Sequence, residues 1–304
     1  MQGFQVVNLL IPQDPEYLDL QTPAGGWTLV QHVNFAAAKA AILGASSRRS
    51  QSPPVAETYY LENPAGMDQG AAACDRAHKE LTPILLAATY ATGLSVTIQR
   101  STMSSDVQIA EPGDHWPRVR GLFAPSYIVT TPHEFQRLVA AVIASWSTAG
   151  KTEKALLLIH HWLDALSCWS MEDLYLSATT LLQIIVATEA DRQGKDELPF
   201  LPGLNAAATR MGIAPLGPDV KNMRNELVHD GRLIGTRFSG PGIDECAELV
   251  AEVLNWFDSY MHVALQLGPV KQTRFKGRDF RGLNAYSIYP DNGEEDETGN
   301  GPQH

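Results

Sequence analysis

The chain is poor in cysteine, in long apolar runs and in recognisable leader sequences. Its three cysteines, Cys74, Cys168 and Cys246, lie far apart and form no C-x-x-C pair, so neither a disulfide framework nor a cysteine-based zinc site is indicated. No apolar run approaches the roughly 18 residues of a membrane span, and residues 1–11 lack the basic start and cleavage site of a secretory signal. We therefore expect a soluble cytoplasmic protein with buried thiols and no membrane partner.

Several common enzyme motifs are also missing. The sequence contains no G-x-x-x-x-G-K-[ST] phosphate loop, no G-x-G-x-x-G turn, no H-E-x-x-H pair and no G-x-S-x-G elbow. These absences argue against the usual nucleotide hydrolases, zincins and serine hydrolases. We expect no cofactor and no bound metal.

Basic residues are fewer than acidic ones. The 23 lysines and arginines against 34 acids give a formal charge of −11, which argues against non-specific coating of nucleic acid but leaves room for a local RNA site. Part of the excess lies near the end of the chain, in Asp291, Glu294, Glu295, Asp296 and Glu297. Because the last stretch is also short of apolar residues, we expect an acidic, disordered C-terminal tail.

What is present predicts an α+β protein of two unlike parts. Residues 1–131 mix strand-like segments (4–12, 94–101 and 126–131) with alanine-rich helical ones (35–43 and 70–92, the second bent or broken at Pro83). This part is predicted to be a mixed α/β domain of unknown type, with a possible sensor or partner-binding role. From residue 132 to 268 successive helical patterns predict an all-α bundle, at 133–149, 153–169, 172–192, 204–211, 220–229 and 244–267. Residues 269–304 are a basic, aromatic extension followed by the tail.

The stretch DVKNMRNELVHDG at 219–231 carries the most chemistry. A preceding proline and Gly231 mark the two ends of a short helix, on which apolar residues recur at helical spacing, namely Val220, Met223 and Leu227. Asn225 and His229 are one turn apart, whereas Arg224 lies about 140° round the helix from His229 and must reach with its long side chain. A guanidinium to grip phosphate, an imidazole to move a proton and an amide to orient one of them suit phosphodiester cleavage.

The same residues carry a family resemblance. Arg224-Asn225-Glu226-Leu227-Val228-His229 resembles the R-N-x-x-x-H form of the Arg-x4-6-His motif of HEPN domains, and the helical order of residues 152–268 resembles the larger, abortive-infection type of HEPN protein. The resemblance implies a metal-independent endoribonuclease that works as a homodimer, with Arg224 and His229 as the catalytic pair and Asn225 beside them. It also implies anti-phage defence or a toxin-like stress response, with a regulatory protein or a nucleic-acid-guided partner possible.

One position departs from a narrower relative. HepT-type toxins have a tyrosine two residues after the histidine, where this chain has Gly231. The alternative to the nuclease is a non-catalytic HEPN module that binds RNA, a nucleotide or a protein partner.

Further candidates surround the motif. Glu189 could support Arg224 or His229, or could form an ordinary salt bridge at a helix end. Lys221 is a candidate RNA contact on the motif helix, and the extension adds Lys271, Arg274, Phe275, Lys276 and Arg278. Charge interleaved with aromatics suits single-stranded RNA, but the phenylalanines could equally anchor the extension on the bundle.

Two other groups leave both interpretations open. The stretch DHWPRVRGLFAP could bind a ligand through residues 115–120 or could simply pack, and the arginines of SSRRSQSPP could touch phosphate or stay solvated. His160 and His161 lack partners at metal-ligand spacing, and His262 is expected to be a packed residue.

Overall fold

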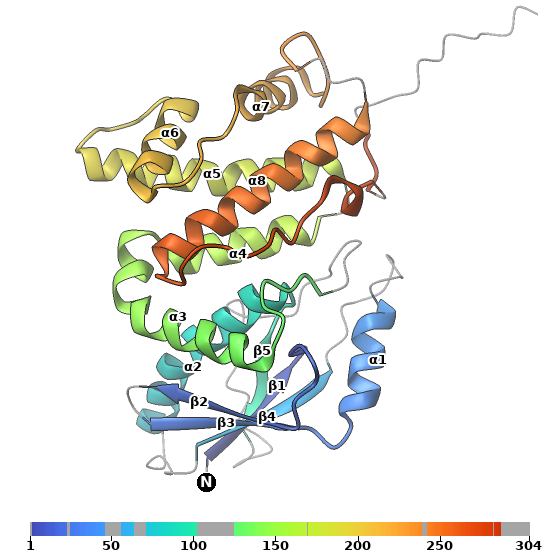
Figure 1. The fold of residues 1–304 in the computed structure, drawn as a ribbon, viewed down its shortest axis with the longest axis vertical. Coiled ribbons are helices and arrows are strands. Elements are labelled where there is room, and N and C mark those ends of the chain that lie inside the picture. Colours follow the sequence, from blue (N-terminus) through green and yellow to red (C-terminus); the bar gives the residue numbers. More distant parts are fainter. Residues whose placement is uncertain are drawn as a thin grey trace, which may run out of the picture.

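The computed structural model describes residues 2–22, 25–45, 56–63, 71–101, 125–168, 170–238, 242–281 and 283–286. Within these ranges the chain forms an antiparallel sheet at one end and a set of packed helices at the other, with α2 and α3 between them (Figure 1). The α+β class is confirmed. No helix among the described residues is long and apolar enough to cross a membrane.

The sheet has five described strands, β1 (Gln2–Val7), β2 (Tyr17–Thr22), β3 (Gly25–Gln31), β4 (Glu57–Asn63) and β5 (Thr97–Ser101). Their order across the sheet is β2-β3-β4-β1-β5, and each neighbouring pair is antiparallel. In β2 the residues alternate, with Leu18 and Leu20 buried and Tyr17 and Asp19 exposed, so this strand turns one face to the core.

The strand predictions are partly right. The apolar segment at 94–101 contains β5, and the segment at 4–12 overlaps only the second part of β1, while β2, β3 and β4 were not anticipated. The prediction of a strand at 126–131 is wrong. Ser126 and Ile128 donate their backbone N–H groups to Thr92 and Ala91 at the end of α2, at 2.9 and 3.0 Å, so this segment lies along a helix end and not in the sheet.

The helices are α1 (Phe35–Ala45), α2 (Ala71–Thr92), α3 (Pro132–Thr152), α4 (Ala155–Leu166), α5 (Met171–Gln193), α6 (Phe200–Met211), α7 (Pro218–Asp230) and α8 (Ile243–Ala264), with a short 3-10 turn, η1, at Gly277–Asp279. The helical second half is therefore confirmed. Of the two alternatives expected at Pro83, a bend or a break, the break is excluded because α2 continues through this residue.

The two halves share one apolar core. Helix α3 packs on both α2 and β2, and Tyr90 of α2 meets Trp162 of α4 edge to face, with ring centroids 5.6 Å apart. Helices α4, α5 and α8 lie beyond α3, and α6 and α7 lie at the far end from the sheet (Figure 1). The predicted boundary at residue 132 is therefore the point where strands give way to helices, and the apolar core is continuous across it.

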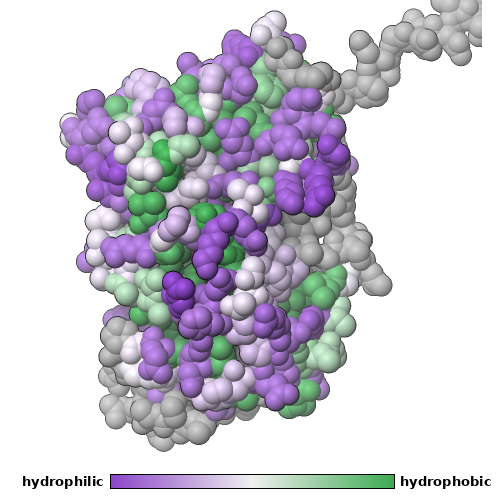
Figure 2. Space-filling view, in the orientation of Figure 1, coloured by the Kyte–Doolittle hydropathy of each residue, from purple (hydrophilic) through white to green (hydrophobic). Residues whose placement is uncertain are grey.

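The surface seen in Figure 2 is mostly hydrophilic, with apolar side chains in scattered patches. Such scattered exposure is normal for a folded chain and marks no binding face by itself.

Candidate functional site

Helix α7 carries the Arg-His motif, and its apolar side packs against the neighbouring helices. It starts with Pro218 in its first turn and ends at Gly231, whose φ of 68° is the left-handed conformation that glycine adopts without steric cost. The predicted apolar stripe is buried, and the Tyr175 hydroxyl of α5 donates to the Val220 carbonyl oxygen at 2.6 Å. Because a helix of 13 residues is only marginally stable by itself, α7 is stabilised mainly by packing against its neighbours.

Arg224 is half-buried and lies over an aromatic ring. Its guanidinium carbon is 4.8 Å from the centroid of Phe200, the first residue of α6. Among the residues that the structure describes, Arg224 has no ion-pair partner and its guanidinium makes no hydrogen bond. By contrast, Arg210 and Arg274 each hydrogen-bond a carboxylate through the guanidinium Nε at 2.8 Å. Arg224 is thus oriented by stacking, with its donors left for a ligand.

His229 and Asn225 lie on the same helix one turn apart. His229 is exposed in the last turn, and Asn225 is partly buried. Within the described part of the chain, the side chains of Arg224, Asn225 and His229 form no hydrogen bond with one another. The three residues share one helix end without forming a preassembled triad inside one chain.

Glu226, in the middle of the motif, was not predicted to have a role. Its side chain is fully buried, and its Oε1 accepts from the backbone N–H of Arg237 at 2.5 Å. Its Oε2 has no hydrogen bond, and the Nε of Arg232 is 3.5 Å away. A Cβ at Gly235 would lie 2.2 Å from this Oε2, so a larger residue there would have to displace the Glu226 carboxylate. The carboxylate therefore anchors the loop 231–238 under the helix.

The anchored loop adds cations to the end of α7. The side chains of Arg232 and Arg237 are 48% and 46% exposed, enough to meet a ligand while the loop stays in place. Arg237 Nη1 also donates to Asp230 Oδ2 at 2.5 Å, and this hydrogen bond lowers the pKa of the Asp230 carboxyl. The sequence signal that could have found Glu226 is its place three residues after Met223, on the buried side of the helix.

Of the two roles expected of Glu189, the structure shows the salt bridge at a helix end and not the support of Arg224 or His229. Its Oε2 accepts from Arg210 Nε at 2.8 Å and its Oε1 from Gln193 at 3.2 Å, with no contact to Arg224 or His229. Burial alone would raise its pKa, but the hydrogen bonds from Arg210 and Gln193 outweigh burial and the net pKa is lowered. The same arginine also bonds Glu153, so Glu189 belongs to a buried network that joins helices.

Arg274 and Phe275 of the extension are interior residues, so their expected contact with RNA is also corrected. The side chain of Arg274 is 1% exposed and Phe275 is 3% exposed. Arg274 binds the buried Asp258 through two hydrogen bonds, and its guanidinium lies over the rings of Tyr90 and Trp162. The alternative interpretation, in which the extension is anchored on the bundle, accounts for both residues.

The remaining cations of the prediction lie at the surface. Lys221, Lys276 and Arg278 are exposed, and Lys271 is exposed but donates to Glu134 at 2.7 Å. The other stretches considered, residues 48–49 and 115–120 and the acidic tail, lie outside the described residues.

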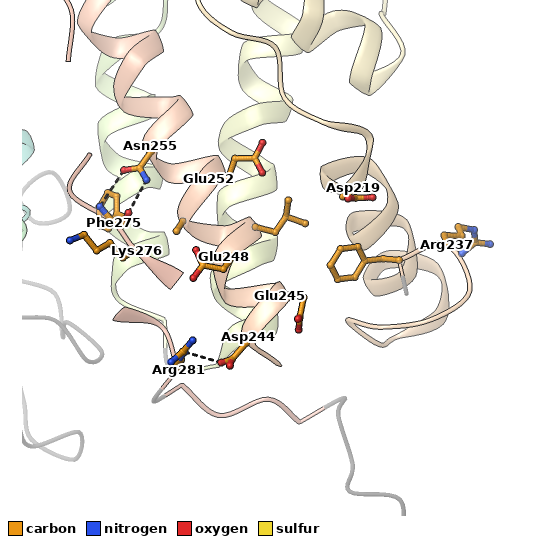
Figure 3. Close-up of a pocket in the computed structure, with 13 residues that line it drawn as sticks. Asp219, Arg237, Asp244, Glu245, Glu248, Glu252, Asn255, Phe275, Lys276 and Arg281 are labelled. Carbon is orange, nitrogen blue, oxygen red and sulfur yellow. Dashed lines mark hydrogen bonds and ion pairs between the residues drawn. The ribbon is translucent and has the colours of Figure 1, made fainter. Parts of the chain in front are cut away.

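A large groove beside α7 is acidic and does not contain the motif pair. It has a volume of about 960 Å³ and lies between α7, α8 and the extension (Figure 3). Five acids line it, with Arg237, Lys276 and Arg281 at its edges; the acids are Asp219, Asp244, Glu245, Glu248 and Glu252. Because these carboxylates would repel phosphates, the groove is a poor path for RNA.

The chain matches no protein-family model, no curated protein and no solved structure with which it was compared. In the described part of the chain, no group of three or more histidine, cysteine or acidic side chains could hold a metal ion. The candidate site therefore stands on its own geometry: one stacked, unpaired arginine, one exposed histidine and a loop anchored beside them.

Proposed function

We propose that the chain is a metal-independent endoribonuclease of HEPN type, with Arg224 and His229 as its catalytic pair. The observation that carries the proposal is the state of Arg224. A half-buried guanidinium normally has a carboxylate partner, as Arg210 and Arg274 do, whereas Arg224 is stacked on Phe200 with its donors unpaired. Such a guanidinium suits a phosphate that arrives from solution.

The reaction needs one proton to leave and another to arrive. The imidazole of His229 is exposed, so it can reach a substrate and take the proton from a ribose 2′-hydroxyl or give one to the leaving 5′-oxygen. The 2′-oxygen then forms a bond to phosphorus as the bond from phosphorus to the 5′-oxygen breaks. The products carry a 2′,3′-cyclic phosphate and a 5′-hydroxyl, and DNA is not a substrate because it lacks the nucleophile.

Arg224 would neutralise the charge that builds on the phosphate oxygens in the transition state. Stacking on Phe200 holds the planar donor fork in place before the substrate arrives, which reduces the entropy lost on binding. Arg232 and Arg237 would extend the phosphate contact along the RNA. Glu226 would act as a positioning residue through the loop that carries both arginines.

A homodimer completes the proposed site. The reaction needs one group to accept the proton of the 2′-hydroxyl and another to donate a proton to the 5′-oxygen. Among the described residues, no second acid or base is hydrogen-bonded to the His229 side chain. A second copy of α7 across the cleft would supply a second histidine and a second arginine. By resemblance, we further propose a cytoplasmic role in phage defence or a toxin-like response, with residues 1–131 sensing a trigger or partner.

The test compares two variants with a matched control. His229→Ala should lower the cleavage rate at saturating RNA by about 10²–10⁴-fold while leaving RNA affinity within about threefold, because the imidazole acts on the proton. Arg224→Lys should also lower the cleavage rate, because lysine keeps the charge but lacks the planar set of donors and the stacking on Phe200. His133→Ala, which removes an exposed histidine on α3, should cleave as wild type does.

The second candidate is a non-catalytic module that binds RNA, a nucleotide or a protein. It is favoured by the lack of any hydrogen bond among Arg224, Asn225 and His229. In that case Arg224→Ala would weaken binding, and neither the wild type nor His229→Ala would cut RNA in the presence or absence of the partner. Asn225→Ala separates the two further, because it should slow cleavage only if the amide orients a catalytic group.

A further inference from the structure

A second cavity lies where the two halves of the chain join, away from α7. It has a volume of about 410 Å³ and is lined by the segment 128–130, α3, the end of α8 and the residues that follow it. Half of its lining residues are apolar, among them Ile128, Val129, Leu138, Ala141, Leu267 and Pro269, and the other half are polar or charged. Cavities of this size that combine apolar walls with polar groups are typical of small-molecule sites, and they favour junctions between structural units.

His262 of α8 lines this cavity, and one of its ring nitrogens is buried without a hydrogen-bond partner. The residue is 8% exposed; its Nδ1 lies 3.0 Å from the Gly268 carbonyl oxygen, and its Nε2 is buried without a partner. Because a carbonyl oxygen only accepts, Nδ1 carries the hydrogen and Nε2 is an acceptor in the neutral ring. Burial lowers the pKa of His262, which keeps the ring neutral at pH 7. Nε2 can therefore accept a hydrogen bond from an O–H or N–H donor.

Gln266, which also lines the cavity, occupies a backbone conformation that favours glycine. It follows the end of α8 with a φ of 56°, whereas α5, α6 and α7 end at Gly194, Gly212 and Gly231 with φ between 65° and 68°. Retaining a side chain there strains the backbone. The strain is explained if the amide of Gln266 contacts a ligand.

The charges around the cavity favour an anion. Lys271 and Glu134 line it as a pair 2.7 Å apart and offset each other. Arg137 also lines it, and this side chain has no ion-pair partner within the described ranges. The net charge of the lining is thus positive although the whole chain is acidic.

We propose that this cavity binds a small organic anion with an apolar, ring-sized body and one hydrogen-bond donor. The anionic group pairs with Arg137, the body fills the space over Leu138 and Ala141, and the donor satisfies Nε2 of His262. Gln266 adds a polar contact at the edge. The proposal stands apart from the nuclease, since neither Arg224 nor His229 is involved.

The test uses three related probes on the full chain, measured by isothermal titration and by ligand-observed NMR. These are 3-(4-hydroxyphenyl)propionate, which has every feature; 3-phenylpropionate, which lacks the donor; and tyramine, which replaces the anion with a cation. We expect saturable binding of the first with a dissociation constant of about 1 mM or tighter. Loss of the donor should weaken binding about 5–10-fold, and reversal of the charge about tenfold or more.

Three variants assign the binding to this cavity. Ala141→Trp should fill the cavity and abolish binding, and Arg137→Gln should remove the preference for the anion over tyramine. Gln266→Gly should weaken binding about threefold or more while the melting temperature stays the same or rises, because glycine relieves the strain. The control Gln13→Gly relieves a similar strain (φ 66°) in an exposed turn and should leave binding unchanged.

Several results would overturn the proposal. They are the absence of saturable binding, equal affinity for all three probes, or unchanged binding in folded Ala141→Trp and Arg137→Gln proteins. Should Ala141→Trp fail to fold, Arg137→Gln decides the matter, because it alters an exposed side chain on the surface of α3.

Discussion

Replacing Arg274 with alanine should destabilise the fold, although Arg274 lies outside the helices, in the extension that follows α8. The side chains of Arg274 and Asp258 are both 1% exposed, and they meet through hydrogen bonds of 2.5 and 2.8 Å. The same guanidinium donates to the backbone carbonyl oxygens of Tyr90 and Ser126, at 2.6 and 3.1 Å. It therefore connects α8, the end of α2 and the segment that leads into α3.

The expected loss follows from what the alanine leaves behind. Asp258 would keep a buried charge without a partner, which costs about 3–5 kcal/mol, and two carbonyl oxygens would lose a donor. The stacking on Tyr90 and Trp162, at 4.7 and 4.5 Å from the ring centroids, would also be lost. With a urea m-value of roughly 3 kcal/mol/M, the unfolding midpoint should fall by about 1–2 M.

The assay is urea unfolding followed by circular dichroism, with two comparisons. Arg278→Ala removes a nearby arginine that is 70% exposed, and it should change stability by less than about 0.5 kcal/mol. The double variant Arg274→Met/Asp258→Leu should be more stable than Arg274→Ala, because no uncompensated charge remains. A loss below about 1 kcal/mol for Arg274→Ala, or weaker RNA binding at unchanged stability, would refute this account of the extension.

Two further predictions concern the motif loop and the joint between the halves. Gly235→Ala should lower the free energy of unfolding by more than about 1 kcal/mol and slow RNA cleavage, because the new Cβ would lie 2.2 Å from the Glu226 carboxylate. The control is Gly44→Ala in α1, where nothing lies within 4 Å of the new Cβ; it should leave stability unchanged or raise it by up to about 1 kcal/mol. Equal shifts in melting temperature for the two variants would contradict the reasoning. The hydrogen bond from Lys271, with help from Thr130, holds the pKa of Glu134 at about 2, below its ordinary 4.5. This contact therefore contributes to stability above pH 4.5 and is lost as the pH falls towards 2. Carbon-13 NMR titration should show this pKa rising in Lys271→Ala, and an unchanged value would contradict the assignment.

The helical part could be predicted from the sequence because its signals are local. Proline and glycine mark the ends of α7, and the observed bounds of Pro218–Asp230 differ from the predicted 220–229 by two residues at one end and one at the other. The strand expected at 126–131 failed for the opposite reason. Its β-branched residues suit a strand, but two of its backbone N–H groups donate to the end of α2. This contact depends on the tertiary fold and cannot be read from the local sequence.

The candidate site shows the same division. The placement of Arg224 and His229 on one helix follows from spacing alone, whereas the partners of each charge do not. Glu189 and Arg274 carry charges that the sequence cannot distinguish from those of a ligand site. Their partners, Arg210 and Asp258, come from α6 and α8 and are brought close only by the fold.

The central claim is that Arg224 and His229 cleave RNA without a metal. The most direct measurement is the cleavage of a labelled, structured RNA in EDTA by wild-type protein and by His229→Ala, with the product ends mapped. The account predicts that only the wild type cuts, that its products carry 5′-hydroxyl and 2′,3′-cyclic phosphate ends, and that a DNA of the same sequence stays intact. Equal cleavage by both proteins, cleavage of the DNA, or a strict need for a divalent metal would contradict it.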